Sequence, residues 1–93
     1  MDVAAFEQEL AALGFTEVLT REWAANQFVD THTHPFEVRA LVTRGEFALA
    51  CGGEVRTYHA GQIFSLKMGV PHTERYGPEG ATFRVGRKRN AAG

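Results

Sequence analysis

The amino-acid sequence predicts an all-β fold, an antiparallel sandwich or barrel preceded by one short helix. Apolar residues recur at helical spacing only before Gly14. After Gly14 the chain changes to short apolar or alternating runs that are separated by turn residues. Because no helical pattern lies between these runs, the sequence favours antiparallel strands over parallel βαβ units.

The opening helix is predicted over residues 2–13. Asp2 is a good N-cap residue, because its side chain can accept a hydrogen bond from a free backbone N–H of the first turn. Gly14 stands where helices commonly end in a left-handed residue. The apolar residues at helical spacing between these two positions are Val3, Phe6, Leu10 and Leu13. This spacing predicts one apolar face that packs on the rest of the protein.

The clearest hairpin is predicted at Gly52-Gly53, which lies between two alternating runs. A two-residue turn with positive φ matches the twist of paired strands, and glycine adopts positive φ without strain. The predicted strands span residues 16–23, 27–34, 38–43, 46–51, 54–58, 63–66, 72–76 and 81–87. Further chain reversals are expected at Arg44-Gly45, Ala60-Gly61 and residues 77–80.

Length and composition indicate one small domain. The chain has 93 residues, of which 44% are hydrophobic, and its formal net charge of -1 gives no field that would attract nucleic acid or an anionic membrane. Cys51 is the single cysteine, so no intramolecular disulfide can form. The first residues lack a signal-peptide pattern, and no run approaches the roughly 20 apolar residues that cross a bilayer. We therefore expect a cytoplasmic protein, with residues 88–93 as a flexible polar tail.

Three histidines provide the clearest functional signal. His32 and His34 are two residues apart, so in a strand their imidazoles would point to the same face. His72 would reach the same place from another strand. Neutral imidazole is a common ligand of transition metals, so this pattern predicts a metal site. His59 has no partner at such a spacing and is expected to be a solvated turn residue.

Two separated motifs make this chain resemble a small single-domain cupin, a family of jelly-roll β-barrels. The first cupin motif has the form Gly-x5-His-x-His-x3-Glu-x6-Gly, and the second has the form Gly-x5-Pro-x-Gly-x2-His-x3-Asn. The resemblance covers residues 27–76 and implies that residues 1–93 form one cupin-like barrel. The motif positions that this sequence keeps are His32, His34 and Gly45 in the first motif and Gly61, Gly69 and His72 in the second.

The first motif lacks its glutamate in this chain. That position is occupied by Val38, and Glu37 comes one residue too early. By strand parity from His34, the side chain of Glu37 should face away from the barrel interior, although a bulge after Pro35 would turn it inward. The fourth ligand that the family ordinarily supplies is therefore missing at its usual place.

Glu74 offers another carboxylate. It lies two residues beyond His72, so in a regular strand it shares the face of that histidine and would reach the metal, a bound water or an imidazole. The alternative is a surface carboxylate that pairs with Arg75 or Arg84. Glu74 and Tyr76 are the residues that we expect to handle a proton in a catalytic site.

Three functions are compatible with these residues. The first is a mononuclear metal enzyme, of dioxygenase or isomerase type, that acts on a small oxygenated metabolite. Its cofactor would be one divalent transition metal ion, Fe, Mn, Ni, Zn or Cu, because histidine spacing does not select among them. The second is a non-catalytic module that binds or senses a small molecule. The third is a structural cupin with a vestigial site, which the loss of the motif glutamate favours.

Two further expectations concern the surroundings of the site. Phe36 and Met68 are predicted near the barrel mouth, as apolar walls of a pocket. Related cupins commonly pair through exposed sheet edges, so the resemblance implies a homodimer. Trp23 and Phe28 are candidates for that interface, unless both belong to the interior of one copy.

Overall fold

The computed structural model describes residues 1–89. Within these residues, six strands follow one helix and form a single sheet. The elements are α1 (Val3–Ala12), β1 (Glu17–Trp23), β2 (Phe28–His32), β3 (Glu37–Cys51), β4 (Glu54–His59), β5 (Ile63–Leu66) and β6 (His72–Lys88).

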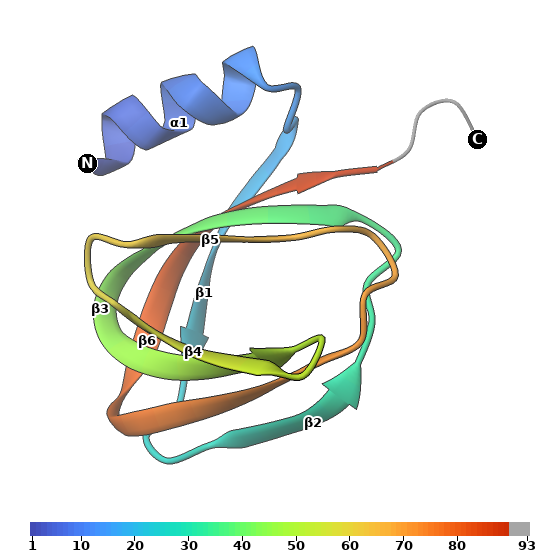
Figure 1. The fold of residues 1–93 in the computed structure, drawn as a ribbon. Helices are drawn as coiled ribbons and strands as arrows, with labels where there is room; N and C mark the ends of the chain where they lie inside the picture. The colour runs from blue at the N-terminus through green and yellow to red at the C-terminus, as the bar shows by residue number, and fades with distance from the viewer. Residues whose placement is uncertain (90–93) are drawn as a thin grey trace.

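The sheet is antiparallel throughout and rolls into a barrel. Its order is β1-β6-β3-β4, and in addition β2 pairs with β6 and β5 pairs with β3. The long strands β3 and β6 curve around the molecule, and α1 lies outside the barrel, above it in this view (Figure 1). The predicted all-β barrel with one short helix is confirmed.

The helix forms as its sequence predicts. The Asp2 side chain accepts a hydrogen bond of 2.8 Å from the Ala5 backbone N–H, and Gly14 follows the helix with φ of 86°. Of the four residues predicted on the apolar face, Phe6 and Leu10 pack on the outside of the barrel, in a small cluster that we call the helix-side core, whereas Val3 and Leu13 are exposed. Its buried members are Phe6, Leu10, Phe15 and Leu41.

The predicted hairpin at Gly52-Gly53 is also present. Both glycines have positive φ, 60° and 82°, and Cys51 pairs with Glu54 across the turn. Two other predicted reversals are wrong. At Arg44-Gly45 and at residues 77–80 the chain continues, so the predicted strands 38–43 and 46–51 merge into β3, and 72–76 and 81–87 merge into β6.

The glycines at these two places bend the strands rather than reverse them. The pairing of β3 with β6 shifts register on both sides of Gly45, which has φ of 76°. A Cβ at Gly45 would collide with the carbonyl oxygen of Gly80, and a Cβ at Gly80 would collide with that of Trp23. Close approach of three backbones at a barrel corner therefore requires glycine here.

The second buried cluster fills the barrel, and we call it the barrel interior. Phe47 lies at its centre, with ring centroids 4.9 Å from Phe64, 4.8 Å from Phe83 and 5.4 Å from Tyr76. Such aromatic pairs bury large apolar areas in preferred geometries. Its buried members are Phe36, Val38, Ala40, Val42, Phe47, Leu49, Phe64, Leu66, Tyr76, Ala81, Phe83 and Val85.

Two residues of the predicted tail, Lys88 and Arg89, make specific contacts. Lys88 is the last residue of β6 and donates a hydrogen bond of 2.9 Å to the Leu13 carbonyl oxygen. The Arg89 guanidinium lies 2.7 Å from a Glu17 carboxylate oxygen. The rest of the predicted tail, residues 90–93, lies outside the described residues.

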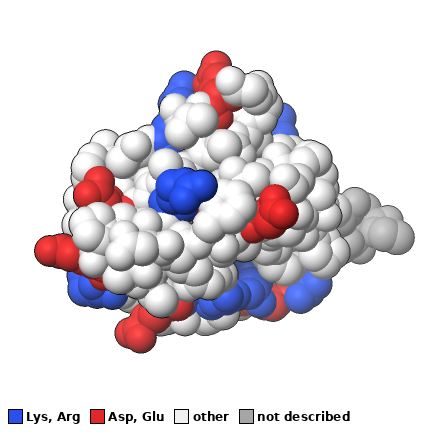
Figure 2. All heavy atoms as spheres, turned by 90° about the horizontal axis from the view of Figure 1, so that it is seen from below, with Lys and Arg blue, Asp and Glu red and all other residues white. Residues whose placement is uncertain are grey.

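One face of the molecule carries charged side chains of both signs. Seen from below, Lys and Arg side chains alternate with Asp and Glu side chains among uncharged residues (Figure 2). In the described part of the chain, no helix has the length and apolar character needed to cross a membrane.

Candidate metal centre

The three histidines come together where β2 and β6 meet. His32 is the last residue of β2 and pairs with His72, the first residue of β6. His34 lies in the connection to β3, because β2 ends two residues earlier than the predicted strand. A hydrogen bond of 3.0 Å from the Gly69 backbone N–H to the His34 carbonyl oxygen ties this connection to the one before β6.

The imidazoles face one another. The ring centroid of His32 lies 4.2 Å from that of His72 and 5.0 Å from that of His34, and the remaining pair is 5.2 Å apart. One potential ligand atom from each ring lies within 4.8 Å of the other two. Two nitrogens that bind one ion at about 2.1 Å are at most about 4.2 Å apart, so the cluster is close to coordination geometry.

Backbone carbonyls orient two of these rings. His32 Nδ1 lies 2.7 Å from the Asp30 carbonyl oxygen, and His72 Nδ1 lies 3.0 Å from that of Val70. A carbonyl oxygen only accepts hydrogen bonds, so Nδ1 is the protonated nitrogen in both contacts. In the neutral rings this leaves the lone pair on Nε2, the arrangement in which metal-binding histidines are usually held.

His72 supplies the test of whether a metal fits. The residue is only 2% exposed, and its Nε2 is buried without an aligned hydrogen bond. An unpaired buried nitrogen is costly, and coordination of a cation would satisfy it. The neighbouring donors are also imidazoles, which suit divalent transition metals. The residues present therefore fit a metal ion.

Glu74 lies beside the histidines and not on the surface. It is 7% exposed, and its Oε2 lies 3.1 Å from His32 Nε2 and 3.3 Å from His72 Nε2. The other carboxylate oxygen accepts a hydrogen bond from the Tyr76 hydroxyl. Pairing with Arg75 or Arg84, the alternative that the sequence left open, is not what the structure contains: Arg84 instead pairs with Glu7.

These contacts set the charge of the site. Burial alone would raise the pKa of Glu74, but the adjacent His72 ring and the hydrogen bond from the Tyr76 hydroxyl outweigh it and hold that pKa below its ordinary value. Burial and donation to Glu74 both raise the pKa of Tyr76, so its hydroxyl keeps the proton. For His72, burial lowers the pKa, yet Glu74 and the Val70 carbonyl raise it by more. Burial and the neighbouring histidines lower the pKa of His34.

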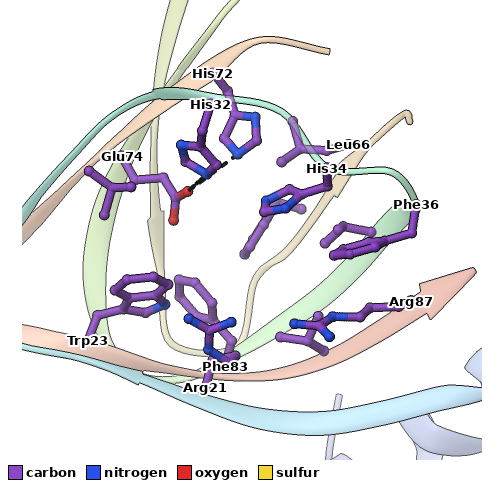
Figure 3. A pocket seen from close by; sticks show the side chains of 14 residues that line it. Arg21, Trp23, His32, His34, Phe36, Leu66, His72, Glu74, Phe83 and Arg87 are labelled. Atoms are coloured by element: carbon purple, nitrogen blue, oxygen red, sulfur yellow. Dashed lines mark ion pairs between the residues drawn. The ribbon is translucent and has the colours of Figure 1, made fainter. Parts of the chain in front are cut away.

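A cavity of about 190 Å³ opens in front of the histidines. His32, His34 and His72 occupy one side of it, and two arginines, Arg21 and Arg87, occupy the other side (Figure 3). Sequence reasoning missed both arginines. The remaining lining residues are Trp23, Val29, Phe36, Val38, Phe64, Leu66, Glu74, Phe83 and Val85.

A sequence signal for the two arginines does exist. On β1, Arg21 occupies the same face as Leu19 and Trp23, because side chains alternate along a strand. Arg87 in the same way continues the inward row of Phe83 and Val85 on β6. A charged residue in an otherwise apolar inward row is unusual, and it often marks a function.

Other predicted residues take the following places. Phe36 lines the cavity, whereas Met68 is 41% exposed and is not among the lining residues. The lining also includes Val38 but not Glu37, in agreement with strand parity. His59 is exposed and lies 3.5 Å from Glu46, away from the cavity.

The two residues suggested for a dimer interface lie in different environments. The Trp23 ring stacks on Tyr76 at 5.2 Å and lines the cavity, which fits the alternative that it belongs to the interior of one copy. Phe28 is 47% exposed, with the Arg75 guanidinium 4.7 Å from its ring. Pairing between copies stays a prediction.

Comparison with known families identifies the domain. Residues 15–85 match the family model of the AraC-like ligand binding domain. The chain belongs to this family. No curated protein matches the chain.

Solved structures confirm that this AraC-like ligand-binding domain has the cupin fold. A Rhizobium leguminosarum protein of unknown function has a TM-score of 0.74 and 23% identity, covering 78% of this chain and 69% of its own. A Klebsiella pneumoniae protein with a double-stranded β-helix domain has a TM-score of 0.67 and 28% identity, with coverage of 82% and 69%. An RmlC-like cupin from Shewanella frigidimarina has a TM-score of 0.68 and 19% identity, with coverage of 80% and 66%. The predicted cupin resemblance and jelly-roll barrel are thus correct.

Proposed function

We propose that this cupin domain binds one divalent transition metal ion through the Nε2 atoms of His32, His34 and His72, and takes a small oxygenated metabolite into the adjoining cavity. The observation that carries the proposal is the buried Nε2 of His72, which has no aligned hydrogen bond although Glu74 lies 3.3 Å away, in a ring that faces two further imidazoles. Three histidine ligands leave coordination positions open, which is typical of catalytic sites. When bound, the ion would supply Lewis acidity beside the ligand.

The chain's own groups around that position are suited to proton transfer. The Glu74 carboxylate is held ionised by its neighbours, so it can accept a proton from a ligand in the cavity. Tyr76 is absent from the cavity lining, and its hydroxyl donates to Glu74. We therefore assign Glu74 the proton-transfer role and Tyr76 a positioning role, in a reaction of isomerase or dioxygenase type.

The decisive experiment measures metal content and affinity. Protein prepared without an affinity tag is stripped with a chelator, titrated with Zn²⁺ or Co²⁺ and followed by calorimetry. We expect one ion per chain in the wild type, and affinity at least about 100-fold weaker in His32→Ala and His72→Ala, because each removes one of three ligands.

His59→Ala is the matched control. This histidine is exposed and distant from the cavity, so its removal should leave the tight site intact. Equal loss of affinity in all three variants would point to nonspecific surface binding. Absence of stoichiometric binding in the wild type for every metal tested removes the proposal.

A second function is supported by the family match. AraC-like ligand binding domains are named for ligand binding, so the same cavity would serve a module that binds or senses a small molecule without chemistry. A ligand that raises the melting temperature of metal-free protein, and is recovered unchanged from the metal-loaded protein, would support this function over the enzymatic one. If neither metal nor ligand binds, a structural cupin with a vestigial site remains.

A further inference from the structure

The cavity collects the unpaired buried polar atoms of the structure. Among the described residues, the buried side-chain nitrogens without a hydrogen-bond partner are Trp23 Nε1, His72 Nε2 and Arg87 Nε. All three residues line the same cavity. Buried donors are normally paired, so two N–H groups left open at one place indicate that an acceptor-bearing ligand completes them.

The two arginines of the cavity form no ion pair, a property that among the other described arginines only Arg44 and Arg75, which lie outside the cavity, share. Arg39, Arg56, Arg84 and Arg89 each lie within ion-pair distance of a glutamate. In the described part of the chain, no such pair involves Arg21 or Arg87. Their guanidinium groups instead lie over aromatic rings. The Arg21 guanidinium is 4.7 Å from the ring centroid of Trp23, and the Arg87 guanidinium is 4.6 Å from that of Phe36.

Stacking of this kind fixes a guanidinium and leaves its N–H edge free. Arginine held on an aromatic face presents a rigid fork of donors that matches a carboxylate in two parallel hydrogen bonds. Both arginines lie across the cavity from the histidines (Figure 3). The side of the cavity with Arg21 and Arg87 is therefore cationic, and the opposite side carries Glu74, which would repel an anion.

The rest of the wall limits the ligand. A volume of about 190 Å³ suits a small metabolite. Apolar side chains such as Val38, Phe64 and Leu66 also line the cavity. The ligand would thus carry one anionic end and a compact body.

We propose that the cavity takes a small organic acid, whose carboxylate is held by Arg21 and Arg87 with the Trp23 indole as a further donor, and whose other end faces the three histidines. This inference deepens the proposed function and rests on it for the position of the ligand beside the metal. Binding of the carboxylate itself involves only the chain's own side chains, so it is measurable on metal-free protein.

The test compares acids with their neutral amides. Acetate, pyruvate and benzoate are titrated against acetamide, pyruvamide and benzamide by calorimetry and by ¹⁵N NMR. Trp23 is the single tryptophan of the chain, so its indole N–H gives one resonance. We expect at least one acid to bind at least about tenfold more tightly than its amide, and to shift the indole resonance and an arginine Nε–H resonance.

Variants locate the binding. Arg21→Gln and Arg87→Lys should each weaken binding of that acid about tenfold or more, the second because lysine keeps the charge but loses the fork. Arg87→Lys remains informative if Arg21→Gln does not fold. Arg56→Gln, which removes an exposed arginine outside the cavity, should bind the acid as the wild type does.

The contrary outcomes are equally clear. If no acid binds more tightly than its amide, or if sulfate binds as well as the acids and shifts the same resonances, the inference is wrong. Acid binding without any metal binding would remove the proposed metal centre and leave this inference in place. Metal binding without discrimination between acid and amide would remove this inference and leave the proposed metal centre in place.

Discussion

The helix-side core and the barrel interior lie on opposite faces of β3, because Leu41 points toward α1 whereas Ala40 and Val42 point into the barrel. The helix-side core is apolar, and none of the unpaired buried nitrogens of the described residues belongs to it. All of them line the cavity of the barrel interior. One face of the strand is thus packed for stability, and the other keeps polar groups open.

This difference separates stability from binding. Packing an apolar face gives stability in proportion to the area that it removes from water. Open buried donors and an unpaired imidazole cost stability, and are retained where a ligand uses them. Substitutions in the helix-side core should therefore change unfolding without changing binding, and substitutions beside the cavity should change binding first.

Leu10→Ala should have the largest effect on stability. Leu10 is 0% exposed and packs in the helix-side core. Truncation of such a leucine should lower the free energy of unfolding by about 3 kcal/mol, measured by denaturant titration. Metal affinity of the folded variant should stay within about twofold of the wild type, because the site lies on the other side of the sheet.

Leu13→Ala is the control for this substitution. Leu13 is 46% exposed at the end of the same helix, so its loss should cost less than about 1 kcal/mol. If metal affinity falls together with stability in Leu10→Ala, the two regions form one cooperative unit. Stability and binding would then not be separable.

Glu74→Gln should give the largest effect on binding outside the three histidines. Glutamine keeps the size of the side chain and an acceptor for the Tyr76 hydroxyl but removes the negative charge beside His32 and His72. Loss of such a partner typically weakens metal binding about 10- to 100-fold, which calorimetry would measure. Tyr76→Phe retains the carboxylate and should have a smaller effect. Equal affinities in Glu74→Gln and wild type would exclude a role for this carboxylate in metal binding.

Much of this arrangement follows from local sequence patterns. Helical spacing, the Asp2 cap and the Gly52-Gly53 turn act through neighbouring residues, and each formed as predicted. The prediction that Glu74 shares the face of His72 succeeded because both residues lie on β6, where alternation holds. These features need only residues close together in the chain.

The errors have a non-local cause. Gly45 and Gly80 suggested turns, because the need for glycine comes from a distant backbone that the sequence does not place. Arg21 and Arg87 were missed because their importance depends on what lies across the cavity, on strands far away in the chain. Strand alternation correctly placed His34 beside His32, but His34 lies in a loop after the end of β2, where alternation does not apply.

Gly86→Ala should test how closely α1 packs on the barrel. A Cβ at Gly86 would lie 2.6 Å from Leu10 Cδ2 and 3.1 Å from Phe15 Cβ, so the helix must shift. We expect a loss of about 1.5 kcal/mol in the free energy of unfolding. In the Leu10→Ala background the added methyl group fills the space that the leucine left. The double variant should therefore lose less free energy of unfolding than the sum of the two single variants. Strict additivity would contradict this contact.

Asp2→Ala should give the smallest effect and the sharpest test of independence. The Asp2 carboxylate caps α1 through the Ala5 N–H, and loss of an N-cap in an end helix should cost about 0.5 to 1 kcal/mol. Asp2→Asn keeps a capping oxygen and should restore most of that loss. Because α1 touches only the outer face of the sheet, neither variant should change the affinity for metal or for an organic acid. A change in either affinity would show that the helix helps to shape the cavity, and that the helix-side core contributes to binding as well as to stability.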